Sequence, residues 1–108
     1  MKLRRFLFLL WAGLLVAAAA CAQPVSTLYD KAEYRIAMRD SVRLHTSVFM
    51  PKAPGKAPII IFRTPYGTGP YGEGQFPGSF EKGYMRSYVD RGYIIVQQDV
   101  RGRYMSEG

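Results

Sequence analysis

Two short apolar runs, neither interrupted by a polar residue, constrain the fold of this chain more than any other feature. The first is Ile59-Ile60-Ile61-Phe62 and the second is Tyr93-Ile94-Ile95-Val96. Apolar runs of strand length without polar alternation are typical of strands covered on both faces, as in the parallel sheet of an α/β protein. The segment between the runs is long enough for a crossover helix, so the sequence predicts a right-handed βαβ unit.

A helix is predicted between the two runs, beginning near Ser79 and ending at Gly92. Ser79 is a suitable N-cap residue, and Gly92 is a suitable C-terminal stop. Apolar side chains recur with the helical period and would form one buried face: Phe80, Tyr84, Met85, Tyr88 and Val89. Gly83 lies inside this helix and would cost roughly 1 kcal/mol relative to alanine.

An antiparallel hairpin is predicted before the first run. Apolar and polar residues alternate over 34–39 and again over 42–50, the period of half-buried strands, and Arg39-Asp40-Ser41 is a turn signal. His45 would lie on the outer, exposed face of the second strand. The prolines of 51–58 cannot continue a strand. The predicted fold class is therefore α/β, with an antiparallel hairpin followed by a parallel strand, helix and strand, as at the start of an α/β-hydrolase sheet.

Residues 1–22 are predicted to be a signal peptide. A basic start precedes the apolar run 6–20, which is short for a membrane span. Two processing outcomes are open: cleavage at an Ala-Cys-Ala motif before Gln23, or lipidation of Cys21 at a bacterial lipobox in which Ala18 replaces the usual leucine. Either outcome exports the mature protein to the periplasm, the medium or a lipid-anchored position at a bacterial membrane.

Charge and cysteine content exclude several classes of function. The formal net charge is +7, and three of the basic residues lie in the signal peptide, which leaves +4. The remaining basic residues are interspersed with eight acidic ones, so a nucleic-acid partner is not expected. The single cysteine excludes an internal disulfide framework and a multi-cysteine metal site, and neither metal nor cofactor is expected. A membrane would be contacted only through the signal peptide or a lipid on Cys21, and self-association as a homo-oligomer stays open.

Residues 23–30 are predicted to be a linker, and residues 31–108 the N-terminal portion of a larger α/β domain. Two strands buried on both faces would have a single helix to cover them. The last strand would stand as an apolar edge, which folded proteins avoid. A domain of this kind needs roughly 200 or more residues to complete its core.

Tyr66 is the candidate functional residue, because it stands in a Pro-Tyr-Gly turn four residues beyond the end of the first apolar run. Parallel sheets place their chemistry just beyond the carboxyl ends of the strands, and a phenol can donate a hydrogen bond to a developing oxyanion. Packing of Tyr66 beneath its own loop is the alternative. His45, the only histidine, has no carboxylate neighbour in the predicted topology and is expected to be a surface residue. Ser106 is rejected as a nucleophile, because Tyr104 stands where the first glycine of a Gly-x-Ser-x-Gly elbow belongs.

A series of motifs extends over most of the mature chain, from about residue 29 to residue 108. It consists of Met38-Arg39-Asp40-Ser41-Val42-Arg43-Leu44, Arg63-Thr64-Pro65-Tyr66, Arg91-Gly92-Tyr93, Gln98-Asp99-Val100-Arg101-Gly102 and Ser106-Glu107-Gly108. The series resembles the cocaine-esterase-like serine hydrolases, which include α-amino-acid ester hydrolases, glutaryl-cephalosporin acylases and Xaa-Pro dipeptidyl-peptidases. The Arg-Thr-Pro-Tyr motif is most similar to the α-amino-acid ester hydrolases. Ser41 departs from the family, which usually has glycine at this position.

The resemblance implies a Ser-His-Asp hydrolase that acts on an α-amino-acid ester, a β-lactam-type amide or an Xaa-Pro peptide. The nucleophile, on a Gly-x-Ser-Tyr-x-Gly elbow, would lie beyond Gly108 together with the acid and the histidine, and Tyr66 would donate its hydroxyl to the oxyanion. Asp99 and Arg101 match a family motif and are interpreted as structural, an ion pair or a backbone anchor for their loop. A catalytically inactive, surface-anchored binding protein that keeps the fold is the alternative.

Overall fold

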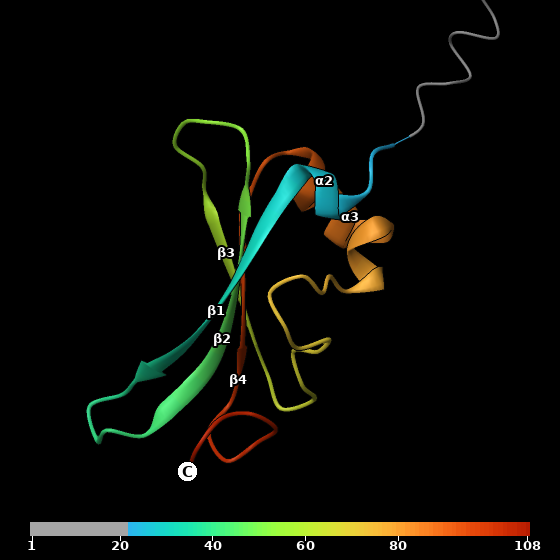
Figure 1. Ribbon diagram of the computed structural model, residues 1–108. Coiled ribbons are helices and arrows are strands. Elements are labelled where there is room, and N and C mark those ends of the chain that lie inside the picture. The colour runs from blue at the N-terminus through green and yellow to red at the C-terminus, as the bar shows by residue number, and fades with distance from the viewer. Residues whose placement is uncertain (1–21) are drawn as a thin grey trace, which may run out of the picture.

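A mixed sheet of four strands organises the chain in the computed structural model, which describes residues 22–108 (Figure 1). Cys21 and the predicted signal peptide, except for its last residue, lie outside the described residues. The strands are β1 (Tyr29–Ala37), β2 (Arg43–Pro51), β3 (Ile59–Thr64) and β4 (Ile94–Asp99), and their order in the sheet is β1-β2-β4-β3. β1 and β2 pair antiparallel, β2 and β4 pair antiparallel, and β3 and β4 pair parallel. This confirms the predicted α/β class, with a hairpin followed by a parallel unit.

The position of the last strand differs from the prediction. β4 lies between β2 and β3, so the apolar edge strand is β3. Ile59 and Ile61 on this edge are 60% and 61% exposed, whereas Ile95 of β4 is fully buried. The crossover returns the chain to an interior position because β2 still offers an unpaired edge there. Composition alone does not distinguish the two placements, since both strands are equally apolar.

The predicted single helix is divided into two pieces. A 3₁₀ turn, η1 (Gly78–Glu81), precedes the α-helix α3 (Gly83–Asp90). Gly83 adopts a φ of +70°, a left-handed conformation that a right-handed helix cannot contain, so the chain turns there. Lys82 therefore occupies the N-cap position of α3, without a side-chain hydrogen bond, and Ser79 does not cap this helix.

The division of the helix also changes which side chains are buried. Phe80 is buried by η1, and Met85 and Val89 are buried by α3. Tyr84, predicted on the apolar face, is instead 72% exposed, because the turn at Gly83 rotates α3 relative to η1.

The segment expected to be a linker belongs to the folded unit. It contains the short helix α2 (Val25–Leu28) and the start of β1. Val25 is fully buried, and its backbone N–H donates to Glu81 Oε1 at 3.0 Å. The Tyr29 hydroxyl donates to the carbonyl of Tyr93 at 2.6 Å, which joins the first strand to the turn after α3. These contacts are long-range, so local composition does not predict them.

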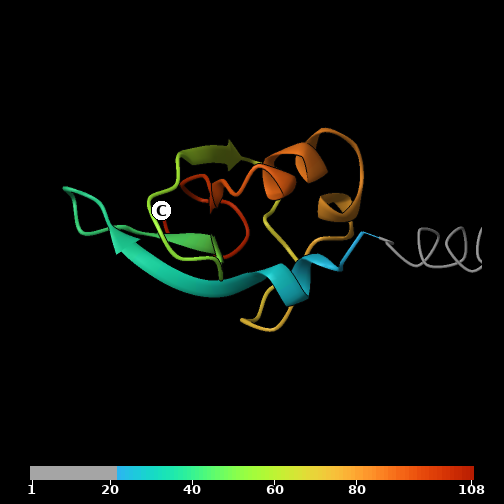
Figure 2. The same ribbon diagram turned by 90° about the horizontal axis from the view of Figure 1, so that it is seen from above.

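The core lies between the sheet and the helices that gather on one side of it (Figures 1 and 2). Its centre is Phe49 of β2, whose ring lies 4.8 Å from that of Phe80 and 5.7 Å from that of Phe76. The other fully packed members are Val25, Tyr29, Met85, Val89 and Ile95. β2 is buried on both faces rather than half-buried. His45 and Phe49 lie on one face, which the loop over 65–77 and the helices cover, and Leu44 and Thr46 on the other face are buried as well. Within residues 22–108, no helix is long and apolar enough to cross a bilayer.

Candidate active site

The carboxyl ends of β3 and β4 lie side by side and direct two loops to one edge of the sheet. Thr64 pairs with Asp99 in the parallel register, and the N–H of Val100 donates to the carbonyl of Thr64 at 3.1 Å. The loops over 65–77 and 100–108 therefore leave the sheet at the same place. This is the edge at which open α/β sheets place their chemistry.

Tyr66 stands in the first of these loops, two residues beyond the end of β3. Its backbone N–H donates to Thr64 Oγ1 at 3.1 Å, which turns the chain away from the strand. The Tyr66 side chain is 84% exposed. Its phenol therefore does not pack beneath the loop, in contrast to the alternative prediction.

Gly67 brings the two loops into contact directly after Tyr66. It adopts a φ of +92°, and a Cβ placed on it would lie 3.1 to 3.2 Å from three ring carbons of Tyr104. The Tyr104 ring thus lies flat against the Gly67 backbone, while the residue itself holds a φ of +48° and remains 63% exposed. From the sequence, Tyr104 was considered only as the residue that stands in place of the first glycine of a Gly-x-Ser-x-Gly motif. Its position here depends on the meeting of two loops.

Asp99, at the end of β4, forms hydrogen bonds with both loops. It is fully buried, and its Oδ2 accepts a hydrogen bond from the Tyr71 hydroxyl at 3.0 Å and from the Met105 N–H at 3.4 Å. The Asp99 carbonyl also accepts from Ser106 Oγ at 2.6 Å. Burial and the hydrogen bond to Asp99 raise the pKa of the Tyr71 phenol above its usual value. Tyr71 therefore remains a neutral donor to the carboxylate.

Arg101 anchors the second loop elsewhere. Its guanidinium donates two hydrogen bonds to the Asp40 carboxylate, at 2.7 and 3.1 Å, and this pairing lowers the pKa of Asp40. One expectation was that Asp99 and Arg101 form an ion pair with each other, and this is wrong. Each of them holds the loop to a different part of the molecule. Ser106 accepts from the His45 backbone N–H at 2.9 Å, so its hydroxyl serves the same anchoring.

The prediction for His45 is wrong. The residue is only 5% exposed, and its Nε2 lies 3.4 Å from Ser47 Oγ and 3.9 Å from Glu33 Oε1. The Tyr71 ring packs edge-on against the imidazole, with the ring centroids 5.1 Å apart. His45 lies on the same face of β2 as the core residue Phe49, so the prediction reversed the two faces of this strand; the loop over 65–77 covers His45 there through Tyr71.

Glu33 and Lys31 complete this buried polar cluster, and sequence reasoning missed both. The Lys31 Nζ lies 3.2 Å from Glu33 Oε1, and the Lys31 side chain has no exposed surface. Burial opposes ionisation of Glu33, but the Gly72 N–H bond and the Lys31 ammonium outweigh it, so the pKa of the carboxyl lies below its usual value. The available signal was the presence of opposite charges two residues apart, on one face of a strand.

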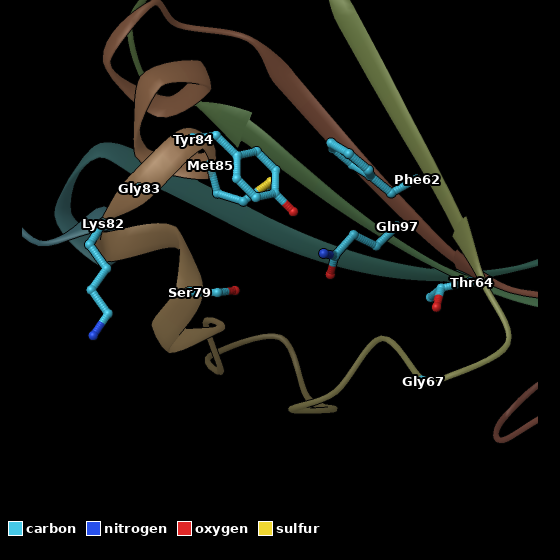
Figure 3. Close-up of a pocket in the computed structure, with 9 residues that line it drawn as sticks. All are labelled: Phe62, Thr64, Gly67, Ser79, Lys82, Gly83, Tyr84, Met85 and Gln97. Carbon is cyan, nitrogen blue, oxygen red and sulfur yellow. The ribbon is translucent and has the colours of Figure 1, made fainter.

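A hollow of about 430 Å³ opens between the sheet and α3, next to the Tyr66 loop (Figure 3). Phe62, Thr64 and Gln97 line it from the strands, and Tyr84 and Met85 line it from α3. The Oε1 atom of Gln97 is buried and has no hydrogen-bond partner among the described residues. In the part of the chain that the structure describes, no three His, Cys, Asp or Glu side chains are grouped to hold a metal ion.

The sequence pattern of the X-Pro dipeptidyl-peptidase (S15) family matches residues 40–108, which include both loops of this site. The chain belongs to the S15 family. The resemblance to cocaine-esterase-like hydrolases is thereby confirmed, because the S15 chain is also 36% identical over 73 residues to cocaine esterase from Rhodococcus sp. (strain MB1 Bresler). That alignment covers 68% of the S15 chain and 12% of the esterase.

Two solved structures share the fold of the S15 chain. One is a selenomethionine-labelled α-amino acid ester hydrolase, with a TM-score of 0.60 and 38% identity. The other is an aminopeptidase from the marine sediment archaeon Thaumarchaeota archaeon, with a TM-score of 0.58 and 34% identity. Each alignment covers 82% of the S15 chain and 15% of the solved chain. The S15 chain therefore has the fold of a hydrolase family and spans less than a sixth of the length of these relatives.

Proposed function

We propose that the S15 chain forms the N-terminal part of the catalytic domain of an exported serine hydrolase. The reaction is hydrolysis of an acyl ester or amide, with an α-amino-acid ester, a β-lactam-type amide or an Xaa-Pro peptide as the substrate class. The names of the relatives support this class, since they are an esterase, an amino acid ester hydrolase, an aminopeptidase and a dipeptidyl-peptidase family. Export rests on the basic and apolar pattern of residues 1–22.

Tyr66 supplies one donor of the oxyanion hole in this proposal. A serine beyond residue 108 attacks the acyl carbonyl, its proton passes to a histidine, and the carbonyl oxygen becomes an oxyanion. The Tyr66 hydroxyl donates to that oxygen, beside the backbone N–H that follows the serine. The tetrahedral intermediate then collapses, the bond to the alcohol or amine breaks, and the histidine gives its proton to that leaving group, which leaves an acyl-enzyme. Water attacks the acyl-enzyme by the same route and releases the acid and the free serine. The observation that carries the proposal is the 84% exposed phenol in the loop after β3, at the edge where the strands end.

Replacing Tyr66 by phenylalanine in the full-length protein tests this role. The variant removes one hydroxyl, so kcat should fall by about 10²–10³-fold, the usual cost of losing an oxyanion donor. Tyr34→Phe is the matched control: this tyrosine is also exposed, at 52%, but it lies on the edge strand β1 at the opposite side of the sheet.

The assay is steady-state hydrolysis of an activated α-amino-acid ester, normalised by active-site titration. A kcat for Tyr66→Phe equal to that of Tyr34→Phe would refute the oxyanion role. A wild-type protein that binds such esters without turning them over would instead support the inactive binding protein.

A further inference from the structure

A buried ion pair lies beneath the loop that carries Tyr66. The Lys31 side chain has no exposed surface and that of Glu33 is 21% exposed, although charged groups are almost never buried unless they are paired. Taking two charges out of water costs several kcal/mol per ion in typical proteins, and the attraction between them often does no more than offset this. The attraction between the two charges therefore adds little by itself, and the further contacts that the pair makes become important.

The pair holds the backbone of the loop at two points. Lys31 Nζ donates to the Pro70 carbonyl at 2.7 Å, and Glu33 Oε1 accepts from the Gly72 N–H at 2.7 Å. The two atoms also lie 3.2 Å from each other, so they act as one unit. Pro70 and Gly72 flank Tyr71. The Lys31–Glu33 pair therefore binds the loop backbone on both sides of Tyr71.

Tyr71 is held from two further directions. Its ring packs edge-on against His45 at 5.1 Å, and its hydroxyl donates to Asp99 Oδ2 at 3.0 Å. The loop is therefore fixed at Pro70 by β1 and at Tyr71 by β2 and the end of β4. At its other end the loop is fixed at Thr64, which belongs to the β3–β4 ladder. Residues 65–69, including Tyr66, lie between these two fixed points, and Gly67 among them also contacts the Tyr104 ring.

We propose that the Lys31–Glu33 pair is a positioning device for Tyr66, which holds the loop so that the Tyr66 hydroxyl stays where the oxyanion forms. This rests on the oxyanion role proposed above for Tyr66. Neither Lys31 nor Glu33 touches the reacting atoms; they act through the backbone at Pro70 and Gly72. A displacement of about 1 Å at a catalytic group can cost on the order of 10²-fold in rate, which makes such a support worth its desolvation cost.

A double-mutant cycle in the full-length protein tests the device. Glu33→Ala removes the acceptor for Gly72 and the partner of Lys31, and kcat should fall roughly 10- to 100-fold with KM changed by less than about threefold. Glu33→Gln keeps an oxygen for Gly72 and should retain more activity than Glu33→Ala. In the Tyr66→Phe background, Glu33→Ala should cost nothing further, because there is no hydroxyl left to position.

Asp30→Asn is the matched control. Asp30 lies on the same strand and pairs with Lys52 at 3.9 Å, but this pair is exposed and does not contact the loop. The control should leave kcat unchanged. All values are taken per titrated active site, so that a lower folded fraction does not count as a lower rate, and Glu33→Gln provides the reading if Glu33→Ala fails to fold.

Each outcome decides between the two proposals. An unchanged kcat in both Glu33 variants, or an equal loss from Glu33→Ala with and without the Tyr66 hydroxyl, would overturn the positioning device while leaving the oxyanion role intact. A Tyr66→Phe variant with wild-type kcat would overturn the oxyanion role and the device together.

Discussion

Gly67→Ala is the substitution whose cost can be worked out most directly from the structure. Two effects add. The φ of +92° lies in a region that residues with a Cβ avoid, at a cost of about 1–2 kcal/mol. The new methyl would also lie 3.1 to 3.2 Å from the Tyr104 ring, closer than ordinary contact, so the ring must move by a few tenths of an ångström.

Both effects act on the residue next to Tyr66, so we expect them in the rate as well as in stability. Gly67→Ala should destabilise the full-length protein by more than the φ effect alone, which is about 1–2 kcal/mol, and lower kcat by roughly tenfold. Tyr104→Ala should recover part of the loss, because it removes the ring that the methyl would strike. The part that is due to φ should remain.

The assay is kcat per titrated active site for the two single variants and the double variant, together with urea unfolding of each. If Tyr104→Ala recovers part of the kcat and stability lost in Gly67→Ala, the contact between Gly67 and the Tyr104 ring is a cause of the loss. If Tyr104→Ala recovered nothing in the Gly67→Ala background, or if Gly67→Ala were as active and as stable as wild type, the proposed contact of the two loops beside Tyr66 would be wrong.

Two further predictions concern the hairpin and the buried pair. Ser41 holds a φ of +68°, which strains any residue with a Cβ. Ser41→Gly should therefore stabilise the protein by about 0.5–1 kcal/mol, after the greater freedom of glycine in the unfolded chain is subtracted, whereas Ser41→Ala should give no such gain. A higher free energy of unfolding in urea for the alanine variant than for the glycine variant would contradict this. Glu33 has a folded-state pKa below its usual value of 4.5, so the unfolded state binds its proton first. The stability due to this carboxylate is then complete above about pH 4.5 and is lost as the pH falls through the folded-state pKa. Thermal melts between pH 3 and 6 should therefore decline less steeply for Glu33→Gln than for Asp30→Asn, and identical slopes would exclude the contribution.

The strands were predictable because their signals are local. The runs at Ile59 and Ile94 identified β3 and β4, and alternation identified the hairpin. Which of the two parallel strands lies at the edge was not predictable, because it depends on which neighbour each strand finds. Gly83 was recognised as a weak point in the helix, but only the observed φ shows that the chain turns there.

In the candidate site, too, features with a local sequence signal were predictable and features that depend on long-range contacts were not. The position of Tyr66 beyond a strand end was predictable, because an apolar run and a Pro-Tyr-Gly turn follow each other in the sequence, and its role in the oxyanion hole stays a prediction. The supports beneath it were not, because Lys31, Glu33 and His45 reach the loop through contacts across 26 to 39 residues of chain, such as those from Lys31 to Pro70 and from Glu33 to Gly72. A polar residue on a strand has the same pattern whether solvent or a returning loop covers it.

The oxyanion role of Tyr66 is tested most directly by the structure of the full-length protein with a phosphonate bound covalently to its serine. Such an adduct mimics the tetrahedral intermediate and places an oxygen where the oxyanion forms. We expect the Tyr66 hydroxyl to lie about 2.5–3.0 Å from that oxygen, within hydrogen-bond distance. A phosphonate oxygen held by other donors, with the Tyr66 hydroxyl more than about 4 Å away, would contradict it.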